Sequence, residues 1–163
     1  MPKQIVFPIV VFLHDLFTAV WIGGLITLGV TVLPAARKTL GMGPQTKDLL
    51  DTIQKRLSVM VYVCIVGLIL TGLLMANRSA AFQGLFSFGN TYSALLSVKH
   101  ILVIVMIVVA LARSLFLGRQ QGAAAQGQQK LKAGLLYLNI VLGIVVLLLS
   151  GFCTALSAGP PVG

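Results

Sequence analysis

Four ionisable side chains stand inside long apolar stretches of the sequence, where charge is rare. They form two adjacent pairs, His14-Asp15 and Lys99-His100. An Asp or Lys at the middle of a membrane helix costs about 2.5 to 3.5 kcal/mol on insertion scales, so such residues usually face a protein interior and have a partner. Neutral imidazole binds copper, iron and zinc, whereas a carboxylate and an ammonium can neutralise each other. These two pairs are therefore the first candidates for a functional site.

The apolar stretches around these pairs are long enough to cross a membrane. Of the 163 residues, 58% are hydrophobic and 9% are charged, against about a quarter charged in soluble domains, which argues against a soluble fold. A spanning helix needs about 20 mostly apolar residues, and four stretches provide them: 5–33, 57–76, 93–117 and 133–157. The sequence therefore predicts an all-α protein, an integral membrane four-helix bundle that forms a single domain over residues 1–163.

The distribution of Lys and Arg predicts how the bundle is oriented. The net charge is +9, from twelve Lys and Arg and three Asp and Glu. Cytoplasmic loops are enriched in Lys and Arg, and nine of the twelve lie in or beside the first and third connections: Arg37, Lys38, Lys47, Lys55, Arg56, Arg113, Arg119, Lys130 and Lys132. We therefore expect both termini outside, and a basic surface that marks the cytoplasmic side and not a nucleic-acid site. The first stretch is expected to stay as a span and not to be cleaved as a signal peptide.

The connections between the spans are short and polar. The first, 34–56, begins with Pro34 at the expected end of the first span, and its polar part over 45–56 could form a separate helix at the membrane interface. The second, 77–92, contains several Phe and suggests a hairpin at the interface. The third, 118–132, is expected to be flexible or loosely helical. All three lengths are consistent with one bundle.

The two histidines are predicted to reach a similar depth. His14 lies nine residues past Ile5 and His100 seven residues past Ser93, which is about 14 Å and about 11 Å inward at 1.5 Å per residue. A haem can take one axial histidine from each of two helices, so a b-type haem in electron transfer is one interpretation. Hydrogen-bonded interior histidines and a proton-handling role are the alternatives.

Several small and aromatic residues could contact such a cofactor. Trp21 and Gly24 share a helical stripe with His14, so both are candidate cofactor-binding residues. Glycines in the first two spans would make space for a macrocycle or for close helix contact: Gly23, Gly24, Gly67 and Gly72.

Copper is the other candidate cofactor, with soft sulfur ligands near the outer end. Met75 and Cys153 could join His14 and His100 there, and a transport path could continue through deeper sulfur atoms at Cys64, Met60 and Met106. Cys64 and Cys153 are expected at different depths, which favours two buried thiols over a disulfide.

The motifs of the first three spans resemble those of the copper-resistance D type (CopD-like) membrane domain. They are His14-x6-Trp21-x-Gly23-Gly24 followed by Pro34, then Gly67-Leu-Ile-Leu-Thr71-Gly72, then Tyr92-x2-Leu95-Leu96-x2-Lys99 running on to Ala112-Arg113. The resemblance implies a multi-pass protein in the plasma membrane of a prokaryote, linked to copper uptake or tolerance. Small members of the family often have a His-Asp pair where this chain has Arg113-Ser114, so a copper site that used that pair would be incomplete in this chain.

A weaker resemblance connects the chain with the HemJ-type membrane protoporphyrinogen oxidases. These proteins have a first-span His followed by Trp and a third-span Lys, which correspond to His14, Trp21 and Lys99. This resemblance implies a porphyrin or quinone oxidoreductase in which Lys99 and Asp15 would be catalytic, moving protons or holding substrate carboxylates. The same two residues could instead form a structural ion pair.

A small accessory subunit is the third functional hypothesis, in which the helices pack against other membrane subunits or a redox partner. The sequence leaves open whether the protein is an enzyme. Its expected surroundings are the lipid bilayer in every case.

Overall fold

The computed structural model describes residues 3–76, 86–117 and 125–157, and every regular element in these ranges is helical. The elements are α1 (Lys3–Ile26), a π-helical segment η1 (Thr27–Val32), α2 (Leu33–Leu40), α3 (Pro44–Ala76), α4 (Thr91–Leu117) and α5 (Ala125–Ser157). The all-α fold class is confirmed.

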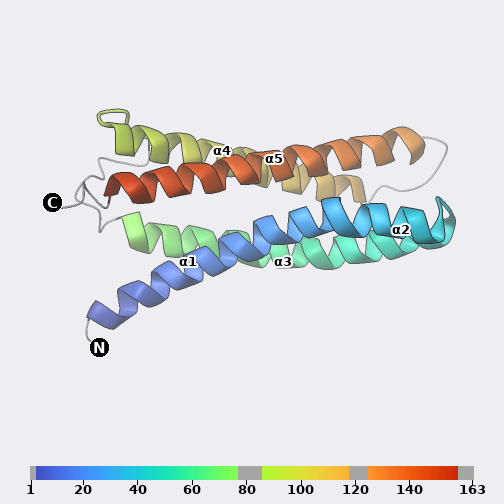
Figure 1. Cartoon of the computed structure of the whole chain (residues 1–163), viewed down its shortest axis with the longest axis horizontal. Helices are drawn as coiled ribbons and strands as arrows, with labels where there is room; N and C mark the ends of the chain where they lie inside the picture. Colours follow the sequence, from blue (N-terminus) through green and yellow to red (C-terminus); the bar gives the residue numbers. More distant parts are fainter. Residues whose placement is uncertain (1–2, 77–85, 118–124, 158–163) are drawn as a thin grey trace.

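The four long helices form two antiparallel pairs, as Figure 1 shows. α1 packs along α3 and α4 packs along α5, whereas the two pairs contact each other less extensively. α1 begins and α5 ends at one end of the bundle, which we call the terminal end. The opposite end, which we call the basic end, carries α2, the turn into α3 and the start of α5. α1 diverges from α4 and α5 toward the terminal end (Figure 1).

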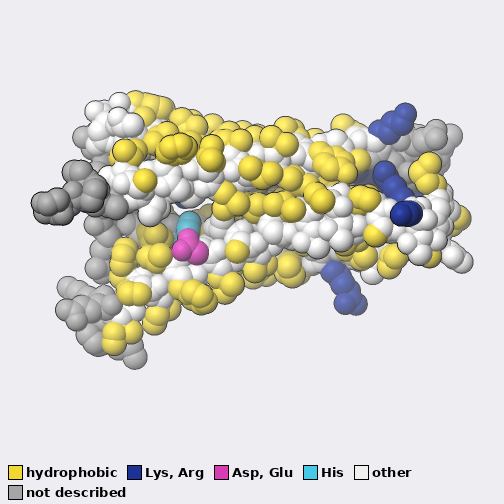
Figure 2. All heavy atoms as spheres, in the orientation of Figure 1, with side chains coloured by type: hydrophobic (Ala, Val, Ile, Leu, Met, Phe, Trp, Pro, Cys, Tyr) yellow, Lys and Arg dark blue, Asp and Glu magenta, His cyan; other side chains and the backbone are white. Residues whose placement is uncertain are grey.

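The outer surface of the bundle is apolar along most of its length. Figure 2 shows hydrophobic side chains over the whole middle of the visible face and Lys or Arg side chains toward the basic end. Four helical stretches are long and apolar enough to cross a membrane: Ile5–Leu40, Pro44–Met75, Thr91–Leu115 and Lys130–Leu156. The predicted four-helix membrane bundle is therefore confirmed, and its outer surface suits contact with lipid.

The first helical stretch continues beyond the predicted end of its span. α1, η1 and α2 follow one another without interruption, and the chain leaves the helical conformation only after Leu40. Pro34 lies in the first turn of α2 and follows the π-helical segment. Proline is tolerated in a first helical turn, where its missing N–H is not required. Pro34 therefore does not end the helix, in contrast to the expectation from the sequence. The reversal falls at Gly41, whose φ of 70° favours glycine.

The second and fourth helices start earlier than the predicted spans. α3 begins at Pro44, so the polar stretch over 45–56 is its first part and not a separate helix. α5 begins at Ala125, so much of the connector predicted over 118–132 is helical. Most of the hairpin predicted over 77–92 lies outside the described residues, as do residues 118–124 of the connector.

Glycines let neighbouring helices approach closely. A Cβ atom on Gly67 of α3 would overlap the Phe17 ring of α1, and one on Gly24 would lie 2.9 Å from Cδ1 of Leu57. Both glycines serve close contact between α1 and α3, which was one of the two roles expected for them. Gly23 has no neighbour that a Cβ would meet within 4 Å and is exposed on the surface.

Candidate metal centre

One stripe of α1 faces α3 and holds the first candidate ligand. From the terminal end inward, His14 contacts Thr71, and Phe17 contacts Gly67. Residue numbers rise along α1 while they fall along α3, as antiparallel packing requires. The stripe predicted from helical spacing therefore exists, and it places the His14 ring between the two helices.

A hydrogen bond to Thr71 fixes the His14 ring. Nδ1 of His14 lies 2.9 Å from Oγ1 of Thr71. The single hydroxyl proton of Thr71 is donated to the carbonyl oxygen of Gly67, at 2.7 Å. Nδ1 of His14 is therefore the donor, and Oγ1 of Thr71 accepts from it. In the neutral ring this leaves Nε2 without a proton and able to bind a metal.

His100 has the same proton arrangement on α4. Its Nδ1 lies 2.7 Å from the carbonyl oxygen of Leu96, one turn earlier in the helix. A carbonyl oxygen only accepts hydrogen bonds, so Nδ1 carries the proton. Nε2 of neutral His100 is therefore unprotonated as well. Both rings are half-buried.

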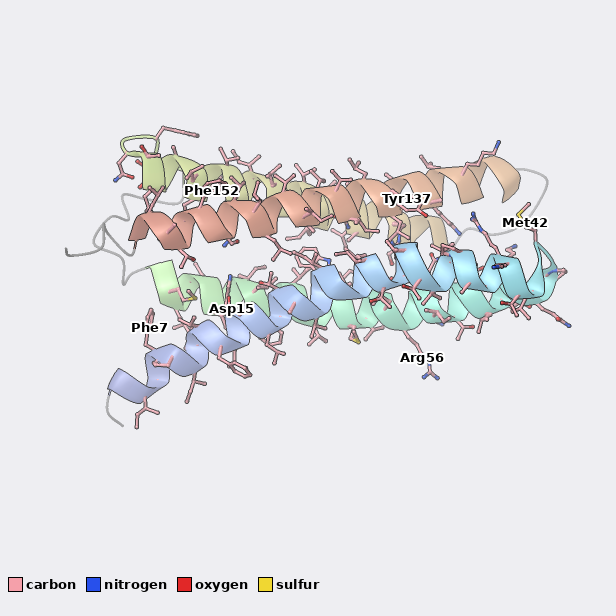
Figure 3. The ribbon with its side chains drawn as sticks, in the orientation of Figure 1. Phe7, Asp15, Met42, Arg56, Tyr137 and Phe152 are labelled. Carbon is pink, nitrogen blue, oxygen red and sulfur yellow. The ribbon has the colours of Figure 1, made fainter. Side chains whose placement is uncertain are left out.

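The charged residues next to the two histidines lie close enough to interact with the His14 ring. His14 interacts electrostatically with Lys99, Asp15 and His100, although these residues lie on two helices far apart in the sequence. Figure 2 shows an acidic side chain beside a histidine on the visible face, and Figure 3 identifies the acidic residue on α1 as Asp15. The structure thus gathers both ionisable pairs of the sequence into one region near the terminal end.

Asp15 and Lys99 do not form a direct ion pair. Asp15 is exposed and Lys99 is half-buried, and their charges interact without a nitrogen-to-oxygen contact within 4.0 Å in the part of the chain that the structure describes. The pairing expected from the sequence is therefore present only as an interaction over a longer distance.

Two sulfur-containing side chains lie toward the same end of the bundle. Cys153 of α5 is buried, is a free thiol, and interacts electrostatically with Lys99. Met75 follows Thr71 by one helical turn on α3 and therefore lies on the same face, closer to the terminal end. Cys64 is a second buried free thiol, on α3, so the prediction of two separate buried thiols is confirmed.

These side chains do not form a closed metal-binding cage. Within residues 3–76, 86–117 and 125–157, no three His, Cys, Asp or Glu side chains are grouped so that they could hold a metal ion together. A site in this region would combine the two imidazoles with thioether sulfur or with groups supplied by the ligand.

Trp21 lies in the core of the bundle, and Gly24 is half-buried in the contact between α1 and α3. Trp21 is 2% exposed and packs among the buried core residues, and its indole Nε1 is buried without a hydrogen-bond partner. Gly24 lies against Leu57, as described above. The sequence reasoning instead missed Thr71 as the partner of His14. The signal available in the sequence was the hydroxyl of Thr71 itself, which lies in an uncharged span at a depth similar to that of His14.

A family model described as copper resistance protein D matches residues 52–153, which is more than half of the chain. The matched region includes Thr71, Lys99, His100 and Cys153, whereas His14 precedes it. Comparison with curated proteins and with solved structures gave no match. On the strength of the family match, together with four apolar helices of spanning length, this chain belongs to the copper resistance protein D family.

Proposed function

We propose that this membrane protein handles copper at the terminal end of its bundle, with Nε2 of His14 and Nε2 of His100 as ligands. One observation carries the proposal. Both rings donate a hydrogen bond from Nδ1 to an oxygen of the protein, so both keep the second nitrogen available. Metal-binding histidines usually donate their other ring N–H in this way, which fixes the tautomer and the ring orientation.

Copper fits the donor set better than the harder divalent metals do. Imidazole and sulfur ligands favour copper, and the region offers two imidazoles with Met75 and Cys153 nearby in the fold. The family to which the chain belongs is named for copper resistance. Copper would be a cargo that the protein binds reversibly, and we propose no redox step for it.

The other residues of the region assist the approach of a cation. Asp15 is exposed beside the site and would attract a positive ion from the surface, whereas Lys99, half-buried next to His100 on α4, would repel it. We further propose that this end faces the outside of a prokaryotic plasma membrane, because Lys and Arg gather at the opposite end.

A b-type haem would use the same two nitrogens, and it is the competing occupant. Two of the four glycines that could make space for a macrocycle are instead filled, by Phe17 at Gly67 and by Leu57 at Gly24. These two glycines therefore leave no space for a macrocycle, which supports a single ion as the ligand.

Copper titration of the purified full-length protein tests the proposal. Cu(I), under reducing conditions and against a chromophoric competitor, is expected to bind at one ion per chain. His14→Ala and His100→Ala should each weaken binding at least tenfold, whereas Cys64→Ser, a buried thiol elsewhere on α3, should bind as the wild type does.

Two results would overturn the proposal. One is a stoichiometry near zero under copper loading, and the other is wild-type affinity in both histidine variants. An absorption spectrum of protein produced with ample haem provides the comparison with haem: a Soret band and an α band on reduction, lost in both variants, would assign the histidines to haem.

A further inference from the structure

A second polar site lies at the basic end, far along the bundle from the two histidines. A cleft of about 90 Å³ opens there between α2, the start of α3 and the start of α5. Arg37, Thr46, Lys47, Asp51 and Lys132 contribute to its lining. One water requires roughly 10 to 15 Å³ of such volume, so the cleft has room for several waters or for one compact anion.

Lys132 of α5 is a buried cation in the wall of this cleft. Its side chain is 7% exposed, and it makes no hydrogen bond or ion pair with any residue that the structure describes. The Asp51 carboxylate acts on it from beyond ion-pair distance, while Lys47 and Arg113 repel it. The Nζ atom itself is not among the buried unpartnered atoms, so it remains accessible and can donate hydrogen bonds to a negatively charged group that enters the cleft.

Thr46 provides a second, independent sign of a missing partner. It lies in the first turn of α3, is 3% exposed, and its Oγ1 is buried with no hydrogen-bond partner. The adjoining Gly43 also lines the cleft. The first backbone N–H groups of a helix lack intrahelical acceptors and carry a partial positive charge. The Thr46 hydroxyl therefore presents an unused hydrogen-bond group to the cleft, near the positive end of this long helix.

The charge around the cleft selects the sign of its ligand. Arg37, Lys47 and Lys132 are opposed by Asp51 alone among the lining residues, so the cleft is positive. A helix start, a hydroxyl and an ammonium group are the donors that bind tetrahedral oxyanions in many proteins.

We propose that this cleft binds a phosphate group, either of an anionic lipid or of free phosphate. The phosphate oxygens would accept hydrogen bonds from the Lys132 ammonium and the Thr46 hydroxyl, and the start of α3 would stabilise the charge. The exposed side chain of Met42, which is 90% exposed and also lines the cleft, offers an apolar neighbour for an acyl chain (Figure 3). The proposal does not depend on copper binding at the other end.

The test measures thermal stability of the purified full-length protein in a neutral detergent. In one arm inorganic phosphate is titrated against potassium chloride of equal ionic strength. In the other, phosphatidylglycerol is titrated against phosphatidylcholine, and bound lipid is counted by native mass spectrometry. A response to phosphate identifies free phosphate as a ligand, and a response to phosphatidylglycerol alone identifies a lipid headgroup.

Matched variants separate the cleft from general charge effects. Lys132→Met and Thr46→Val should each weaken the response at least tenfold. Arg56→Gln, which removes a cation whose side chain points away from the bundle in Figure 3, and Thr39→Val, an exposed threonine of α2, should respond as the wild type does. Because methionine keeps an apolar stem in place of a lysine that forms no ion pair with a described residue, Lys132→Met should be no less stable than the wild type without ligand. The proposal is overturned if neither ligand binds, or if Lys132→Met and Thr46→Val respond as the wild type does.

Discussion

A histidine binds a metal through the ring nitrogen that carries no proton, so the partner of the other nitrogen decides which one is available. In this protein both partners are built into the helices: a threonine hydroxyl across the α1/α3 contact for His14, and a main-chain carbonyl one turn back for His100. The two rings reach the same protonation pattern by different means. Each Nε2 atom is thus available to the proposed copper ion.

Removing the Thr71 hydroxyl tests this preparation. We expect Thr71→Val to weaken Cu(I) binding by about 10- to 100-fold, the usual effect of losing an outer-shell partner. Valine has nearly the same shape, so the helix pair should persist. The measurement is the same competition titration used for the histidine variants.

Thr18→Val is the matched control for this experiment. Its hydroxyl donates to the main-chain oxygen of His14 and does not contact the ring. Its affinity for Cu(I) should stay close to that of the wild type. Equal losses in the two variants would show that the hydroxyl of Thr71 has no particular role in orienting the ring.

At the scale of the helices, close contact between α1 and α3 depends on glycines, which have no side chain to keep the helices apart. A lipid-exposed bundle gains little from the hydrophobic effect between helices, so tight packing of small residues supplies much of the attraction. The Phe17 ring fills the space above Gly67. This contact sits one turn inward from the His14–Thr71 hydrogen bond and holds both helices in register at the site.

Gly67→Val should therefore destabilise the bundle. The added side chain would overlap the Phe17 ring, and overpacking of this kind costs about 1 to 3 kcal/mol. Gly23→Val adds the same atoms to an exposed position of α1 with open space around it, and should change stability by less than about 0.5 kcal/mol. Thermal unfolding of both variants in one detergent gives the comparison, and equal midpoints would contradict the packing argument.

The helices themselves could be predicted from the sequence because a membrane span requires a long uncharged stretch, which hydropathy detects directly. Their ends could not. Pro34 predicts a helix end, but the structure places it in a first helical turn after a π-helical segment, where it is tolerated. Hydropathy likewise separates the polar residues before Leu57 from the apolar ones after it, although hydrogen bonding continues through both in α3.

The site was predictable only in part, for a related reason. Charged residues in apolar stretches are costly, so His14, Asp15, Lys99 and His100 could be found without a structure. Thr71 carries no such cost, and its role depends on which face of α3 meets α1. The packing of Phe17 against Gly67 determines which face of α3 meets α1. This contact joins two helices, so the residue pattern of one helix alone does not predict it. Trp21 shared the His14 stripe in the sequence but lies two turns deeper, in the core.

At the scale of the whole molecule, the separation of apolar and basic regions predicts one orientation in the membrane. Lys and Arg lie toward the basic end (Figure 2), which we expect to face the cytoplasm. In a Cys64→Ser/Cys153→Ser background, Met42→Cys at the basic end should react with an impermeant maleimide only after the cells are permeabilised. Phe88→Cys, just before α4 at the opposite end, should react in intact cells; both side chains are exposed. The reverse labelling pattern would show that the protein has the opposite orientation in the membrane.

The limited contact between the two helix pairs gives the proposed copper ion a mechanical role. His14 belongs to the α1/α3 pair and His100 to the α4/α5 pair, so an ion held by both would cross-link the two halves where α1 diverges (Figure 1). A ligand that binds only the joined form stabilises it by about 2.7 kcal/mol when its free concentration is 100 times its Kd. Copper loading would then close the terminal end, and release would let the halves separate there, so occupancy and the width of that end would change together.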